Sequence, residues 1–513
     1  MREIPRRRLL QLGAGTAIAG LVKPHRVLAA DAGRLVIGID EDLSNLDPAW
    51  RNSPIDDSII RCVCSNLVSF LPGDYDYQND AAESIDTGLT QTIGFVLKQG
   101  LSFGDGFGEV TAEDVKFSYE RFIKPGADGL KPPYAPTWSV LKSVEITGKY
   151  RGRINLSAPS LSFWKNGLAE VSGAILSRKA FEQLGAKTRT QLVGSGPYRL
   201  KEWVPGEHIL LAANPDWHGG PQAFAEILLQ PTRDPDLAID QITKKQIHFA
   251  KILTKDENAV RKVADSRMIA IPSSNHVGLG MNMARTPLDD ARVRKAIRLM
   301  IDPEQVVAAG YAGAADAARS IIAPLSTGYW ADAPEPTRDV EAAKQLLAEA
   351  GRRNPHLRLA VIDLPIYRTV AEIVQNQLRE GGVLVTVDAL APADYWASGR
   401  GEGGKKLELF ITRYSGKFDP AFIMQWFLPE QIGNRNWHRW SNPDYEALYY
   451  EAAALIDLRR RSTKYIEMQT MMDETDAFVP LCHEPNLYVS TTSVIAQILP
   501  NGDDPQYPAF RWA

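Results

Sequence analysis

The chain has 513 residues, more than a single compact core usually holds, so two or three domains are expected. Hydrophobic residues make up 44% and charged residues 23%, which is ordinary for a globular protein. The formal charge of −4, from 58 Lys and Arg against 62 Asp and Glu, excludes the basic surface typical of nucleic-acid-binding proteins. No interior apolar run reaches about 18 residues, so no membrane span is expected after the N-terminal region.

The first thirty residues have the composition of an export signal. Arg6–Arg8 precede a short apolar run that ends at Val22, and the small residues Ala29 and Ala30 follow. Paired arginines before two leucines resemble a twin-arginine signal, which would be cleaved near Ala29/Ala30 and export the folded protein to a bacterial periplasm. The alternative is a cytoplasmic basic tail. No Cys lies near the cleavage zone, so no lipid anchor is expected.

The first elements after the signal are a buried strand at 34–40, a loop at 44–50 and a helix at 56–70. The chain has 3 Cys residues, namely Cys62, Cys64 and Cys482. Cys62 and Cys64 are too close for an easy bridge. A disulfide from one of them to Cys482 is possible in an oxidising compartment, and buried free thiols are the preferred interpretation.

The segment from Ile93 to Phe122 reads IGFVLKQGLSFGDGFGEVTAEDVKFSYERF. Alternating apolar residues predict a strand, three glycines predict a turn, and Thr111 with Asp114 forms the pattern of a helix-capping box. Further along, VGSGPYRLKE at 193–202 and NPDWHGG at 214–220 predict a hairpin followed by a tight turn. A glycine-bearing strand is expected at 277–282 and an amphipathic helix at 287–301.

The later half alternates strands and helices. A strand at 357–363, a helix at 368–380 and a strand at 383–390 predict a parallel βαβ unit. A further strand is expected at 407–413, helices at 445–456 and 459–473, and a last strand at 480–490.

These segments, in this order, resemble the extracytoplasmic solute-binding proteins of family 5, which serve peptide, nickel and related ABC importers. The resemblance runs from about residue 35 to 490. It implies a mixed α/β (α+β) fold with two lobes, a hinge near Met281 and Glu484, and an extra subdomain. Lobe I would cover 31–282, with the subdomain inserted at about 55–190, lobe II would cover 283–480, and 481–513 would return to lobe I.

Catalytic and metal-binding motifs do not emerge from the sequence. The glycines at 104, 106 and 108 do not have dinucleotide spacing, Gly194-Ser195-Gly196 is not a nucleophile elbow, and no HExxH or P-loop occurs. Cys482-His483-Glu484 could offer metal ligands, but neighbouring residues of a strand face opposite sides. No enzyme activity, cofactor or metal is therefore predicted.

The loop after LELFITR is the sharpest candidate for ligand binding. Peptide-binding members of the family carry an acid three positions before an Asp/Glu-Pro pair, and that acid receives the peptide's α-ammonium. Here Asp419-Pro420 supplies the pair, but the equivalent position is Gly416. We therefore expect no standard recognition of a free peptide N-terminus, whereas Arg413 would favour an anionic group. An interlobe salt bridge is the alternative role for Arg413, and a helix cap is the alternative for Asp419.

Other candidates lie in loops that the resemblance places near the ligand, although lone aromatics more often serve packing. The full set of predicted ligand-binding residues is Trp50, Asn52, Ser53, Tyr134, Trp138, Arg413, Tyr414, Ser415, Asp419, Asn436 and Trp437.

The resemblance predicts a monomeric periplasmic substrate-binding protein of an ABC importer. It would capture a peptide-like or other small polar solute and deliver it to permease subunits in the inner membrane. An anionic, sugar-like or opine-like solute is among the candidates. The alternatives are a metal-chelate or cofactor carrier and, with less support, an exported enzyme.

Overall fold

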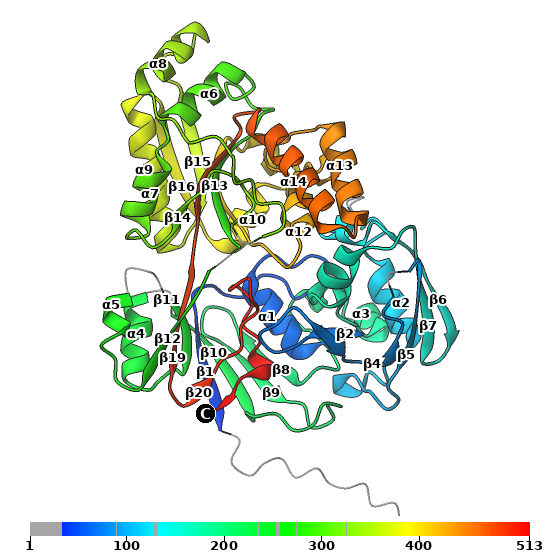
Figure 1. Cartoon of the computed structure of the whole chain (residues 1–513). Coiled ribbons are helices and arrows are strands. Elements are labelled where there is room, and N and C mark those ends of the chain that lie inside the picture. Colours follow the sequence, from blue (N-terminus) through cyan, green and yellow to red (C-terminus); the bar gives the residue numbers. More distant parts are fainter. Residues whose placement is uncertain are drawn as a thin grey trace, which may run out of the picture.

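The computed structural model describes residues 33–88, 90–126, 131–232, 235–252, 257–272, 274–324 and 326–513. Two large β-sheets with helices packed against them form two lobes (Figure 1). The predicted signal segment and its cleavage point lie outside the described residues. None of the helices in the described part of the chain combines the length and apolar character needed to cross a bilayer.

The first lobe is built on a seven-stranded sheet in which β1 occupies a central position, parallel to both of its neighbours. Leu35 and Ile37 of β1 are fully buried, as expected for a strand covered on both faces. In spatial order the strands are β12 (Ser266–Ile271), β19 (Asn486–Thr491), β11 (Phe249–Ile252), β1 (Arg34–Ile39), β10 (Glu226–Pro231), β9 (His208–Ala213) and β8 (Tyr198–Val204).

The second lobe contains a six-stranded sheet, and the predicted βαβ unit is confirmed within it. Strands β15 and β16 pair in parallel on either side of α9 in the chain. In spatial order the strands are β14 (Asp316–Ala317), β18 (Phe478–His483), β13 (His276–Met281), β17 (Leu409–Tyr414), β15 (His356–Ile362) and β16 (Leu384–Leu390).

A four-stranded sheet lies beside the seven-stranded sheet (Figure 1), and one of its strands begins the predicted strand–turn–helix. Thr111 and Asp114 form the expected capping box at the start of α2 (Ala112–Glu120), and the turn before it needs a left-handed backbone at Asp105 and Gly106. The strands of this sheet are β4 (Ala82–Ile85), β5 (Thr92–Leu97), β7 (Arg151–Leu156) and β6 (Leu141–Gly148). Two short pairs complete the strands, namely β2 (Val68–Phe70) with β3 (Tyr77–Asn79), and β20 (Val494–Ile495) with β21 (Arg511–Trp512).

The remaining α-helices are α1 (Pro54–Val63), α3 (Arg178–Leu184), α4 (Pro235–Thr243), α5 (Glu257–Val260), α6 (Ala291–Met300), α7 (Pro303–Gly310), α8 (Val340–Glu349), α9 (Pro365–Glu380), α10 (Pro392–Ser398), α11 (Gly401–Lys406), α12 (Ala421–Met424), α13 (Pro443–Ala454) and α14 (Leu458–Asp473).

The chain passes from one large sheet to the other between β12 and β13, and again between β18 and β19 (Figure 1). The second passage, at Glu484-Pro485, agrees with the predicted crossover. The first lies between the end of β12 at Ile271 and the start of β13 at His276, so the expectation of a crossover near Met281 was wrong: Met281 is the last residue of a strand inside the second sheet. An apolar strand does not reveal in its sequence which sheet it joins. The division into lobes at 282 and 480, and the limits of the subdomain, stay predictions.

All three cysteines are free and buried. Cys62 and Cys64 lie at the end of α1 in the first lobe, whereas Cys482 belongs to β18 in the second sheet. The disulfide considered from the sequence is therefore not formed, because the fold places the candidate partners in different lobes.

Candidate functional site

A cavity of about 170 Å³ lies between the two lobes, at the carboxyl ends of β1, β15 and β17. Such an edge of parallel strands is where ligands bind in α/β folds. Aromatic side chains from both lobes make up much of its wall, and they can cover a bound solute and exclude water from its polar groups. These residues are Tyr134, Phe249, Tyr367, Tyr395, Trp396, Tyr414, Phe422, Trp426, Trp437, Tyr488 and Tyr507.

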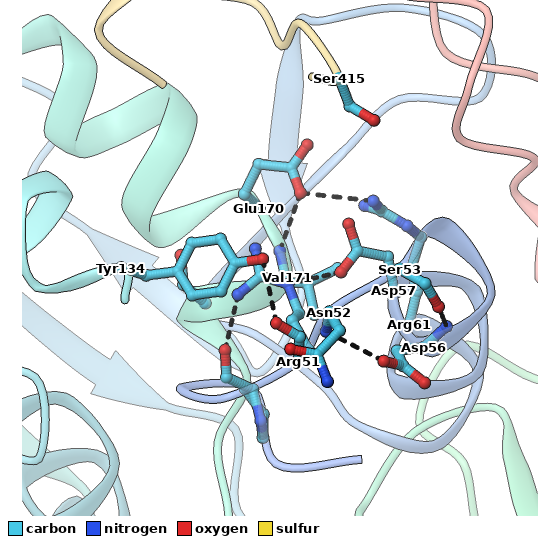
Figure 2. Close-up of polar contacts among 12 residues, drawn as sticks. Arg51, Asn52, Ser53, Asp56, Asp57, Arg61, Tyr134, Glu170, Val171 and Ser415 are labelled. Carbon is cyan, nitrogen blue, oxygen red and sulfur yellow. Dashed lines mark hydrogen bonds and ion pairs between the residues drawn. The ribbon is translucent and has the colours of Figure 1, made fainter. Parts of the chain in front are cut away.

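On the side of the first lobe, the loop before α1 is held rigidly by Asp56 (Figure 2). The carboxylate of Asp56 accepts hydrogen bonds from the backbone amides of Ser44 at 2.8 Å and Asn52 at 3.0 Å, and from the Ser44 hydroxyl at 2.7 Å. Ser53 caps the helix and Pro54 opens it, which suits the fixed φ of proline. Asn52 and Ser53 are thereby fixed in the cavity wall.

A buried layer of ion pairs lies behind this loop. Arg51 pairs with Asp57 and stacks over the ring of Tyr134 at 3.6 Å, while Arg61 reaches Glu170 at 3.4 Å. Figure 2 shows these contacts together with Ser415, which comes from the second lobe. Burial acts to raise the pKa of Glu170, but Lys417, Arg61 and Arg51 outweigh it and hold that pKa below its ordinary value.

Arg413, at the end of β17, links the second lobe to the hinge and to the first lobe. Its guanidinium pairs with Glu484 and Asp503 and donates to the Ser415 hydroxyl at 2.9 Å. Burial acts to lower the pKa of Arg413, but the two carboxylates more than offset it and raise that pKa. The alternative weighed from the sequence, an interlobe salt bridge, is thus what the structure contains.

Lys417 makes a similar link three residues beyond the strand. Its ammonium lies 2.6 Å from Asp504, 3.2 Å from Asp57 and 3.7 Å from Glu170, all in the first lobe. Burial opposes the charge of Lys417, yet these carboxylates raise its pKa. Arg413 and Lys417, here called the compensated pair, both have their charge matched by the chain itself.

Two arginines of the second lobe, Arg435 and Arg400, contact neutral oxygens in place of carboxylates. Arg435 lines the cavity with 8% of its surface exposed and donates to the carbonyl oxygen of Arg51 at 3.2 Å and to Asn52 Oδ1 at 2.9 Å. Arg400 donates to the same Asn52 oxygen at 2.7 Å. Among the described residues neither arginine has a carboxylate within ion-pair distance, and the buried Nε of each makes no hydrogen bond. They are here called the uncompensated pair.

The electrostatics of the uncompensated pair reflect this lack of negative charge. Burial, followed by repulsion from Arg435, lowers the pKa of Arg400 to about 9. Burial likewise lowers the pKa of Arg435, to which nearby Arg51 contributes. Arg435 also lies 4.5 Å above the Trp396 ring, a weak substitute for an anion.

Glu41 and Asp40 follow β1 directly and line the cavity on the first-lobe side. Burial, reinforced by Asp40 and Asp56, raises the pKa of Glu41 to about 8. Glu41 is therefore mostly neutral at pH 7, and it does not supply the charge that the two arginines lack.

Of the predicted site residues, seven line this cavity, namely Asn52, Ser53, Tyr134, Arg413, Tyr414, Ser415 and Trp437. They come from four separate stretches of the chain. Their contact with a ligand stays a prediction, and the fold brings them to one place.

The other four predicted residues do not line the cavity. Trp50 packs against the hydrophobic core, and Trp138 is fully buried and stacked on Phe122. Asp419 pairs with Arg461 and accepts from the Ala421 amide at 2.9 Å, which matches the cap weighed from the sequence. The Asn436 amide donates to the backbone carbonyls of Phe427, Leu428 and Trp440. Side chains occupied in this way have little left to offer a ligand.

Sequence reasoning missed Arg435, Glu41, Trp396 and Asp503 as cavity residues. The sequence could have indicated Asp40 and Glu41 as cavity residues, because they directly follow a buried first strand, and ligands bind at the carboxyl ends of such strands. Arg435 precedes two residues that were singled out, but nothing local distinguishes it from other arginines. In the part of the chain that the structure describes, no group of three or more His, Cys, Asp and Glu residues is arranged to hold a metal ion.

Comparison with known proteins agrees with this architecture. The "Probable D,D-dipeptide-binding periplasmic protein DdpA" of Escherichia coli (strain K12) is 27% identical over 466 residues, covering 87% of this chain and 88% of that protein. The oligopeptide-binding protein AppA of Bacillus subtilis, solved with a nonapeptide, superposes with a TM-score of 0.85 at 22% identity over 94% of this chain and 99% of that one.

The periplasmic binding protein AgaA from A. tumefaciens R10, solved with agropinic acid, gives a TM-score of 0.81 at 20% identity over 90% and 94% of the two chains. These structural likenesses show the two-lobed fold. The family model "Bacterial extracellular solute-binding proteins, family 5 Middle" matches residues 76–434. The chain therefore belongs to family 5 of the bacterial extracellular solute-binding proteins.

Proposed function

We propose that this protein is the periplasmic substrate-binding component of an ABC importer. It captures a small polar solute between its lobes and passes the solute, chemically unchanged, to permease subunits in the inner membrane. The observation that carries the proposal is the aromatic-walled cavity at the strand ends, formed by both lobes of a chain that belongs to a solute-binding family. Two chain passages between the sheets provide a hinge for opening and closing.

The ligand is proposed to be a small solute without a standard peptide N-terminus. A Cβ at position 416 would lie 2.4 Å from the side chain and 2.5 Å from the backbone oxygen of Ser274, so this loop has no space for the acid that would receive an α-ammonium. The acids nearby, Asp57 and Asp503, are already paired with cations of the chain. An anionic solute, of a sugar-acid, opine or modified-peptide type, fits this arrangement better than a tripeptide.

The protein is further proposed to reach the periplasm through the twin-arginine signal at residues 1–30 and to act there as a monomer without a resident cofactor. N-terminal sequencing of the mature protein from a periplasmic extract tests the cleavage near Ala29/Ala30.

Binding and closure are tested together on the purified mature protein. Small-angle scattering is recorded with tri-alanine, D-alanyl-D-alanine, agropinic acid and a nickel–histidine chelate, and each solute is then recovered for mass spectrometry. We expect at least one solute to reduce the radius of gyration and to return unaltered. A chemically altered solute would contradict the proposal, and so would unchanged scattering with the whole set and with whatever co-purifies. Closure with the nickel chelate alone would instead favour the metal-chelate carrier.

A further inference from the structure

Arg435 differs from the other cavity cations in having no negative charge beside it. Arg413 and Lys417 are paired as described, and Lys251 lies 3.7 Å from Asp503. Arg435 is more than nine-tenths buried, and its polar contacts are two neutral oxygens, from Arg51 and Asn52. Burying a guanidinium without a counterion costs free energy. An arginine held in this way therefore indicates an anionic partner that is not part of the chain.

The nearby acid does not fill this role. Asp56 acts on Arg435 electrostatically, but both of its oxygens accept hydrogen bonds from the loop formed by Ser44, Asn45 and Asn52. Within the described residues it is not within ion-pair distance of Arg435. Asp56 instead fixes the backbone of Asn52, and the Asn52 side-chain amide donates to the Ser44 hydroxyl at 3.0 Å. The Asn52 side chain held in this way orients the two arginines through its single carbonyl oxygen.

Arg400 adds a second positive charge at the same point. Arg400 and Arg435 both donate to Asn52 Oδ1, at 2.7 and 2.9 Å, so their guanidinium groups converge on one atom. Two like charges this close repel each other unless an anion lies between or beside them. Arginines commonly bind oxyanions such as carboxylate and phosphate in proteins, through paired hydrogen bonds.

Resting on the proposed function, we infer that Arg435, supported by Arg400 and oriented by Asn52, forms a subsite for an oxyanion group of the transported solute, either a carboxylate or a phosphate. The apolar wall beside the subsite, formed by Trp396, Trp426 and Trp437, takes the body of the solute. Since Asn52 lies in the first lobe and both arginines in the second, the anion binds at a contact that exists only when the lobes meet. Anion binding thereby favours closure.

The test measures, by titration calorimetry, the binding of pairs of probes that are similar in shape and differ in charge. The probes are N-acetyl-L-alanine against N-acetyl-L-alaninamide, D-gluconate against D-sorbitol, agropinic acid, and inorganic phosphate. We expect at least one anionic probe to bind more tightly than its neutral partner, and we expect Arg435→Gln to weaken that binding about 10- to 100-fold, the range for a charge-assisted hydrogen bond. Inorganic phosphate distinguishes the two kinds of oxyanion. A phosphate subsite is expected to bind inorganic phosphate without any organic group attached, whereas a carboxylate subsite is expected to bind the organic acids more tightly than phosphate.

A second readout separates a binding role from a structural one. Arg435→Gln removes a buried charge that the chain leaves unpaired, so the ligand-free variant is expected to unfold at the same temperature as the parent or slightly above it. Arg358→Gln is the matched control, since Arg358 is an exposed arginine of the second lobe paired with Asp388 and outside the cavity. It should leave the affinity unchanged.

Three results would overturn the inference. These are equal binding of anionic and neutral probes, retained affinity in Arg435→Gln, and no response to any anion at millimolar concentration. A neutral or cationic solute that closes the protein in scattering while Arg435→Gln binds it normally would leave the proposed function intact and reject the anion subsite alone.

Discussion

The compensated pair, Arg413 and Lys417, and the uncompensated pair, Arg400 and Arg435, lie in the same lobe at or beside the same cavity, yet they are arranged for different tasks. The first pair meets five carboxylates, from Asp57, Glu170, Glu484, Asp503 and Asp504. The second pair meets only neutral oxygens. A cation that is already neutralised holds the lobes together, whereas one that is not can select a ligand.

The largest effect is expected from Arg413→Gln. The substitution leaves Glu484 buried without the Arg413 cation and Asp503 with only the more distant Lys251, and breaking one side of such a buried pair typically costs about 3–5 kcal/mol of unfolding free energy. Urea unfolding of the ligand-free protein measures the loss. The contrast with Arg435→Gln, which should not destabilise the protein, is the sharpest test of the comparison.

The double variant Arg413→Gln with Asp503→Asn serves as the control, because it removes one of the two stranded charges. Part of the lost stability should return. If both single arginine variants lose the same stability, the distinction between the two pairs fails.

A smaller effect is expected from Gly416→Ala, which probes the loop between the members of the compensated pair. The added methyl group would contact the backbone oxygen of Ser274 at 2.5 Å, at the passage between the two sheets, and overpacking of this kind costs about 1–3 kcal/mol. Thermal unfolding checks it against Gly148→Ala, where the nearest atom to a Cβ is 3.8 Å away. An unchanged melting temperature would show that the loop can move aside, and would reopen the question of an acid at this position.

An effect that depends on pH is expected from Glu41, which lines the cavity on the first-lobe side. Its pKa of about 8 in the folded protein, against an ordinary value of 4.5, means that the folded state holds a proton which the unfolded state releases between these two values. The stability contributed by this group is therefore present below pH 4.5 and is lost as the pH rises toward 8. Unfolding free energies measured from pH 5 to 8 should decline less steeply in Glu41→Gln than in the parent.

The groups that set this pKa act in opposite directions. Asp40 and Asp56 raise it together with burial, while Arg413 and Lys251 lower it. Glu83→Gln, at an exposed position of β4, is the control and should leave the pH profile unchanged. A profile that is the same in Glu41→Gln and in the parent would mean that Glu41 is ionised in the folded protein.

Much of the fold could be predicted from the sequence because its signals are local. The capping box at Thr111 and Asp114 involves residues three positions apart, and the βαβ unit at 356–390 follows from the succession of periodicities. The passage near Met281 was misplaced for the opposite reason, since β13 is buried along its length and its sequence would fit either sheet.

The predictions of cavity residues also divide into those that the structure places at the cavity and those that it places elsewhere. Asn52, Ser53, Tyr414 and Ser415 were predicted because they follow recognisable strands or lie in loops with family spacing, and all four line the cavity. Trp138 and Asn436 satisfied the same criteria, but they are occupied by core packing and by a backbone turn. Whether a loop residue faces a cavity depends on side-chain direction, which spacing alone does not specify.

The sequence by itself determined the family, the two-lobed α/β architecture and several of the loops that line the cavity, because each depends on patterns within a few tens of residues. Only the tertiary structure decided which cations are neutralised. Arg413 is 90 residues from Asp503, whereas Arg435 and Arg400 meet at an asparagine more than 300 residues away. Electrostatic energy depends on distance in space, and the folded chain alone sets those distances.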